Sequence, residues 1–162
     1  MPETLEPSPD EFVIRAAASD SLIARARTVG SLKQLDAAEP LSVLRVEGKA
    51  SSKDAWRAAR QALGEDTPVF PVLYDRDRSP HYPTGEVTVR FEAAPTDGDL
   101  RSFCAKHRLR PLRRNEYAAQ QVVCTPVAGA DEFLPDLVAR LASRPGVRDA
   151  WANTLSRYRR AE

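Results

Sequence analysis

The chain has 162 residues, which is enough for one ordinary domain or two small ones, and its hydrophobic content of 42% is typical of a globular protein. Its formal net charge of +1 excludes a global field that would draw it to nucleic acid or to a membrane surface. No apolar run approaches the roughly 20 residues that span a bilayer, and the first residues lack the basic start and apolar segment of a secretory signal. Two cysteines are too few for a disulfide framework. We therefore expect a reduced, cytoplasmic protein with no cofactor and no membrane association.

The first half of the chain alternates predicted strands and helices. The acidic, proline-rich residues 1–10 are interpreted as a disordered leader. A short side-chain oxygen at Ser51 or Ser52 is suited to capping a helix, and Gly64 is suited to ending it. The segment 31–36 is compatible with either a short strand or a continuation of the preceding helix. The remaining predictions are strands over 11–16, 41–46 and 69–74, and helices over 20–29 and 53–63.

The second half repeats this order. Residues 84–91 alternate apolar and polar side chains like a half-buried strand. Pro135 is tolerated only in the first turn of a helix, so the last helix is expected to begin near Leu134 within the segment 131–143. The other predicted elements are a helix over 97–109 and strands over 112–117, 119–125 and 147–152.

This order predicts an α+β fold of two tandem ferredoxin-like (βαββαβ) units with antiparallel sheets. The prolines and glycine of the segment that joins them favour a hairpin or tight connector, with a flexible linker as the alternative. The side chains expected in the core are Trp56, Phe103, Phe133, Leu137 and Leu141. The predicted organisation is a leader (1–10), a first unit (11–75), a connector (76–85), a second unit (86–153) and an extended C-terminal tail (154–162).

Three segments carry a resemblance to a known family. Residues 71–74, 83–91 and 141–147 resemble the N-terminal prodomains of bacterial subtilisin-like serine proteases, particularly the fervidolysin-like type. The resemblance covers residues 11 to about 153, and it implies a ferredoxin-like fold that chaperones and inhibits a protease. The sequence offers no Asp, His and Ser triad context. We therefore expect a non-enzymatic inhibitor or chaperone of a separately encoded protease, and the alternative is an adaptor or structural subunit that binds without inhibiting.

The resemblance also suggests where a partner would bind. In the prodomains an acidic residue near the matching turn caps a helix of the protease, and Glu116 is the corresponding residue here. The prodomain's last segment lies in the protease cleft as an extended strand, so Leu155 and Tyr158 are candidate anchors. An ordinary solvated turn and a frayed terminus are the competing interpretations. The candidate partner-binding residues are Glu116, Tyr117, Leu155, Arg157, Tyr158, Arg159 and Arg160.

The remaining chemistry-bearing residues favour structural roles. Cys104 and His107 lie three residues apart on a predicted helix, and with Cys124 they could form a Cys–His dyad or a zinc site. A fourth ligand and an orienting group are missing, so we interpret the cysteines as core residues and expect no metal. His81 is expected to be an exposed loop residue.

A basic segment, 106–114, could bind RNA, because ferredoxin-like sheets are among the folds that do. RNA-binding sheets of this kind also need exposed aromatic side chains on their central strands, and the predicted strands 86–91 and 119–125 offer only Phe91. The cations are instead suited to the carbonyl end of a helix. We therefore expect no nucleic-acid partner.

Overall fold

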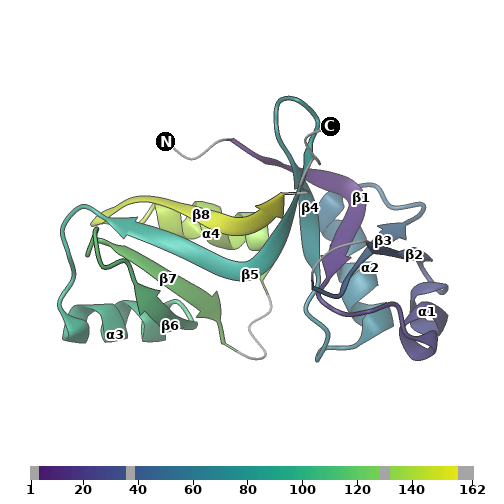
Figure 1. The fold of residues 1–162 in the computed structure, drawn as a ribbon, viewed down its shortest axis with the longest axis horizontal. Helices are drawn as coiled ribbons and strands as arrows, with labels where there is room; N and C mark the ends of the chain where they lie inside the picture. The colour runs from purple at the N-terminus through teal and green to yellow at the C-terminus, as the bar shows by residue number, and fades with distance from the viewer. Residues whose placement is uncertain (1–3, 36–38, 128–131, 157–162) are drawn as a thin grey trace. The chain divides into compact units, whose positions relative to one another are not determined.

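The computed structural model describes residues 4–35, 39–127 and 132–156. It is a mixed α+β structure with eight antiparallel strands and four helices (Figure 1). The chain divides into two compact units, one formed by Met1–Thr84 with Thr154–Glu162 and the other by Gly85–Asn153. The elements are β1 (Glu6–Ile14), α1 (Asp20–Ala26), β2 (Gly30–Leu35), β3 (Leu41–Val46), α2 (Ser52–Leu63), β4 (Phe70–Tyr74), β5 (Pro80–Phe91), α3 (Asp97–Lys106), β6 (Leu109–Arg114), β7 (Gln121–Pro126), α4 (Leu134–Ala142) and β8 (Val147–Ser156).

The first unit pairs its strands in the order β2-β3-β1-β4. The segment 31–36, which the sequence allowed to be strand or helix, lies largely in strand β2. This strand pairs with β3 along its whole length, from Gly30 opposite Val46 to Leu35 opposite Leu41. Gly30 is required there, because an added Cβ would lie 1.7 Å from the carbonyl oxygen of Arg45. The neighbouring strand therefore approaches too closely for any side chain.

Helix α2 packs through one face, as the helical spacing of its apolar residues predicts. The side chain of Ser51 accepts a hydrogen bond from the amide of Asp54 at 3.1 Å and so caps the helix. Gly64 ends it at a φ of 92°, a conformation that favours glycine. The indole of Trp56 is buried and donates to the carbonyl oxygen of Val69 at 3.0 Å, which satisfies its only polar group.

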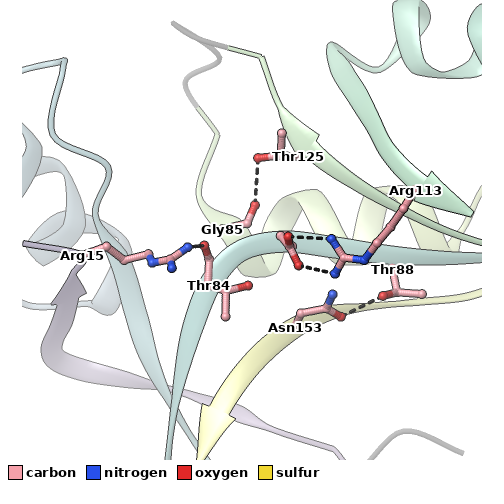
Figure 2. A network of polar contacts seen from close by, with 8 residues as sticks. Arg15, Thr84, Gly85, Thr88, Arg113, Thr125 and Asn153 are labelled. Carbon is pink, nitrogen blue, oxygen red and sulfur yellow. Dashed lines mark hydrogen bonds and ion pairs between the residues drawn. The ribbon is translucent and has the colours of Figure 1, made fainter. Parts of the chain in front are cut away.

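Strand β5 forms a hairpin with β4, in which Leu73 lies opposite His81 and Tyr74 opposite Pro80. The expected connector is therefore a hairpin and not a flexible linker. Within the first unit, Arg15 donates to the carbonyl oxygen of Thr84 at 2.7 Å (Figure 2). Arg15 also pairs with Glu39. The division between the units falls between Thr84 and Gly85, inside this strand.

The second unit has the same order of elements as the first, and its strands lie in the corresponding order, β6-β7-β5, with β8 paired to β5. Val87 of β5 lies opposite Cys124 of β7, and Val89 lies opposite Val122. The hydroxyl of Thr96 caps α3. Helix α4 begins at Leu134 with a proline in its first turn, as predicted from Pro135.

Helix α3 ends earlier than predicted. The sequence suggested a helix to residue 109, but the last helical residue is Lys106 and Leu109 already begins β6. Arg108 adopts a left-handed φ of 56°, which turns the chain out of the helix. The predicted strand 112–117 is displaced for the same reason, because β6 ends at Arg114.

Other boundaries also differ from the predictions. Strand β1 begins at Glu6, so the prediction of a leader over 1–10 is wrong for residues 6–10. Glu6 and Pro7 pair with Tyr74 and Leu73 of β4, which draws a proline-rich segment into the sheet. Strand β8 runs to Ser156, so residues 154–156 belong to the last strand and not to a separate tail. Residues 1–3 lie outside the described part of the chain.

The predicted core is largely confirmed. Trp56, Phe133, Leu137 and Leu141 are buried. Phe103 is half-buried, contrary to the prediction, although its ring contacts that of Phe91 edge to face, with 5.1 Å between centroids. Among the described residues, no helix is long and apolar enough to cross a membrane.

The substitution Leu137→Ala tests this packing. Leu137 is 3% exposed, and removing its buried methyl groups should lower the free energy of unfolding by about 2–5 kcal/mol. The matched control is Leu112→Ala, since Leu112 is 40% exposed on β6 and should change stability by no more than about 0.5 kcal/mol. Urea unfolding measures both values, and equal effects of the two substitutions would contradict the assigned core.

Candidate functional site

The sheet of the second unit presents two chemically different faces. Val87, Val89 and Phe91 of β5 are buried, and Phe91 contacts Phe103 of α3. Because successive side chains of a strand point to opposite faces, Thr88 and Arg90 lie on the other face. We call this other face the polar face. Its residues come from all four strands of the unit.

Ion pairs join strands across the polar face, and one of them reaches from β6 over β7 to β5. Arg113 of β6 donates to both carboxylate oxygens of Glu86, at 3.0 and 2.8 Å (Figure 2). Arg90 of β5 makes a second two-point contact with Asp149 of β8, in which its Nε donates to Oδ1 at 2.9 Å. Two-point contacts fix the guanidinium and the carboxylate in one plane and leave each charge largely neutralised.

Neutral hydrogen bonds hold the same strands. The hydroxyl of Thr88 donates to the side-chain oxygen of Asn153 at 2.8 Å, and that of Thr125 donates to the carbonyl oxygen of Gly85 at 3.1 Å (Figure 2). These contacts join β5 to β8 and to β7. The polar face is therefore fixed in shape before any partner binds.

A pocket of about 310 Å³ lies in the second unit. Trp151 of β8 lines it and is half-buried, and the guanidinium of Arg90 lies 5.9 Å from its ring centroid. An aromatic ring that is partly exposed beside a cation is a frequent anchor for binding partners. The pocket is lined by Thr88, Arg113, Arg114, Asn115, Gln121, Val123 and Trp151.

The turn between β6 and β7 continues from this pocket and carries two of the predicted site residues. The side-chain oxygen of Asn115 accepts from the amides of Tyr117 and Ala118, at 2.9 and 3.2 Å, and so shapes the turn. Glu116 is exposed, and Tyr117 is 98% exposed. The structure therefore brings Glu116 and Tyr117 together beside a pocket-lining residue.

Of the two predicted anchors in the C-terminal segment, the structure describes Leu155. Leu155 is 41% exposed and belongs to the first unit. Arg157, Tyr158, Arg159 and Arg160 lie outside the described residues.

Both cysteines are buried, in agreement with their interpretation as core residues, and His107 is buried as well. The sulfur atoms of Cys104 and Cys124 lie 4.0 Å apart. His107 faces Arg140, whose Nη1 lies 2.7 Å from the imidazole Nδ1, and Arg140 also pairs with Glu132. Because arginine only donates, Nδ1 of His107 accepts and the ring is neutral in this contact. In the described part of the chain, no group of three or more His, Cys, Asp or Glu side chains is placed to hold a metal ion.

His81 differs from its prediction as an exposed loop residue. It lies in β5, its side chain is 18% exposed, and its Nε2 lies 2.9 Å from Oδ2 of Asp75. The other carboxylate oxygen of Asp75 accepts from the amides of Asp77 and Ser79. The hydrogen bond from His81, followed by that from the Ser79 amide, lowers the pKa of Asp75. One carboxylate thus shapes the hairpin turn and positions the histidine.

Sequence reasoning missed Trp151 as a site residue. The sequence predicts the final strand, but the expectation of exposed aromatic side chains concerned the two central strands, 86–91 and 119–125. Alternation along 149–153 would have placed Asp149, Trp151 and Asn153 on one face, and that signal was present in the sequence.

No protein-family model matches this chain, and no curated protein matches it in sequence. The resemblance to protease prodomains therefore remains a hypothesis that rests on the residues quoted for it.

The His107 contact predicts a dependence of stability on pH. Burial is the main cause that lowers the pKa of His107, and Arg140, Arg144 and Lys106 lower it further, while Glu132 opposes them. The unfolded chain therefore takes up a proton near the ordinary pKa of about 6.5, before the folded chain does. The stabilising contribution is complete above that pH and is lost as the pH falls below it.

Replacing His107 by glutamine keeps a hydrogen-bond acceptor for Arg140 but removes the titration. We expect the free energy of unfolding of the unmodified chain to fall more than that of His107→Gln between about pH 7.5 and about pH 5. His81→Gln is the control, because it removes the second histidine and should retain the loss due to His107. Parallel pH profiles for the unmodified chain and His107→Gln would refute the assignment.

Proposed function

We propose that each unit is a ferredoxin-like fold, so that the chain is a tandem pair of such units. The order β2-β3-β1-β4 in the first unit, with β6-β7-β5 and β8 beside β5 in the second, supports this proposal. In each unit the first and third strands lie at the centre, and a helix follows each of them. That is the arrangement of a split βαβ unit.

We further propose that the chain is a non-enzymatic binding module that inhibits or chaperones a separately encoded subtilisin-like or other protease, in the manner of a propeptide. The observation that carries this proposal is the polar face of the second unit, whose pocket contains half-buried Trp151 and adjoins the turn with Glu116 and Tyr117. Tryptophan and tyrosine are the residues on which binding energy most often concentrates in protein interfaces. A nearly fully exposed tyrosine next to a shaped pocket is a surface suited to docking.

The charges of the polar face favour a protein partner over a nucleic acid. Three arginines of this region each have a carboxylate partner: Arg90 pairs with Asp149, Arg113 with Glu86, and Arg114 with Asp97 at 3.7 Å. Binding of nucleic acid draws its affinity from unpaired cations that displace counterions from phosphates. A face whose cations are already paired gains little in this way.

In the proposed complex, Glu116 lies at the amino end of a helix of the protease. A carboxylate is favourable there because the first amides of a helix have no partner within it. Trp151 and Tyr117 supply apolar area to the same interface. The C-terminal segment 154–162, which the resemblance places in the protease cleft, adds a further contact in this proposal.

Binding and inhibition are tested with purified protein and a subtilisin-like protease encoded near it. We expect co-purification and stoichiometric inhibition of peptide hydrolysis. Trp151→Ala and Tyr117→Ala should each weaken binding by about tenfold or more, which corresponds to a hot-spot contribution. Failure of the intact chain to bind any such protease would remove the inhibitor hypothesis.

Charge reversal tests the helix-capping contact separately. Glu116→Lys should weaken binding about fivefold, as expected for the loss of a favourable contact at a helix end. Glu92→Lys is the matched control, because Glu92 is an exposed carboxylate of the same unit that does not line the pocket. Equal effects of the two reversals would indicate a general charge effect and not a specific contact.

An adaptor that binds without inhibiting is the second candidate function, since the polar face can dock a partner without reaching its catalytic centre. Truncation after Ser156 distinguishes the two, because it leaves β8 complete. An inhibitor should lose inhibition while its fold is retained. An adaptor should bind equally well with and without residues 157–162 and leave activity unchanged.

A further inference from the structure

The two cysteines of the chain meet inside the second unit. Cys104 lies on α3 and Cys124 on β7, 20 residues apart in sequence, and their sulfur atoms are 4.0 Å apart. The residues are 2% and 0% exposed. Two free thiols that face each other between a helix and a central strand are positioned to react with each other.

Each thiol affects the acidity of the other. The hydrogen bond with Cys124 lowers the pKa of Cys104, against the opposing effect of burial. The same hydrogen bond and burial both raise the pKa of Cys124. Cys104 is therefore the thiol that ionises first. Once it has ionised, Cys124 is the thiol that donates in the contact, because a thiolate has no proton.

The sulfur atoms lie close enough that a small local movement would bring them to bonding distance. A disulfide requires a sulfur–sulfur distance of about 2.05 Å, so the two sulfur atoms would have to approach by about 2 Å. Rotations about the two Cα–Cβ bonds move the sulfur atoms over distances of this size. The loop that would be closed, from residue 104 to residue 124, is long enough for a cross-link to restrict the unfolded chain substantially.

We propose that Cys104 and Cys124 form a redox-sensitive pair that a peroxide converts into an intramolecular disulfide, which fastens α3 to β7. The thiolate of Cys104 attacks one oxygen of hydrogen peroxide, the O–O bond breaks, and a sulfenic acid and hydroxide form. Cys124 then attacks the sulfur of Cys104, the S–O bond breaks, and water leaves. In total, two thiols lose two electrons and two protons, and one peroxide becomes two waters.

A small oxidant suits this site because both thiols are buried, so access depends on brief local opening of α3. The bond would form on the helix-covered face of the sheet. Val123, which lines the pocket, precedes Cys124 on the strand and therefore points to the opposite face. Oxidation should consequently stabilise the second unit and leave the polar face unchanged, whether or not that face binds a protease.

The test uses the full chain, reduced and then treated with a small excess of hydrogen peroxide in native buffer. Intact mass should fall by about 2 Da as two hydrogens are lost, the product should remain monomeric on a non-reducing gel, and a reductant should reverse the change. Because the chain has only two cysteines, an intramolecular disulfide can join only this pair. The melting temperature should rise by about 5 °C or more.

Cys104→Ala and Cys124→Ala are the matched controls, and neither should show the mass loss or the rise in melting temperature. Four results would overturn the proposal. These are disulfide-linked dimers or a mass gain of about 32 Da from sulfinic acid in place of the mass loss, formation of the bond only in denaturant, or an oxidised protein that melts below the reduced one.

Discussion

In the second unit, the division into core and polar face depends on one constraint. Neighbouring side chains of a strand lie on opposite faces of the sheet. In β5 this constraint assigns Val87 and Val89 to the core and Arg90 to the polar face. In β7 it assigns Cys124 to the core and Val123 to the pocket. The packing of the helix and the candidate docking surface are therefore set by the same register between the two strands. A shift of one residue would exchange the two faces and destroy both.

The elements that could be predicted are those with a strong local pattern. Strand β3 has the predicted bounds, and α2 differs from its prediction by one residue, because its apolar residues recur at helical spacing and Ser51 and Gly64 mark its ends. The start of β1 could not be predicted. It depends on pairing with residues of β4 more than 60 positions away, and that pairing overrides a local composition typical of disorder.

The candidate site was predictable to a smaller extent. A turn carrying Glu116 was predicted between two strands, but the strand predicted over 112–117 also included Glu116 and Tyr117, whereas β6 ends at Arg114. The environment of His81 was not predictable, since it depends on a carboxylate six residues earlier that the hairpin brings alongside it. The early end of α3 also escaped prediction, because the left-handed conformation of Arg108 has no strong signature in an arginine. Ion pairs such as Arg90 with Asp149 follow from strand pairing, which the sequence does not specify.

The two tryptophans have a practical consequence for how this chain can be studied. The protein has one tryptophan in each unit, and their surroundings differ. Trp56 of α2 is buried in the first unit, whereas Trp151 is half-buried on the polar face of the second. A buried indole emits at shorter wavelengths than one in contact with water. Intrinsic fluorescence therefore contains a separate signal from each unit, and replacing either tryptophan by phenylalanine would show whether the two halves of this chain unfold together or one at a time.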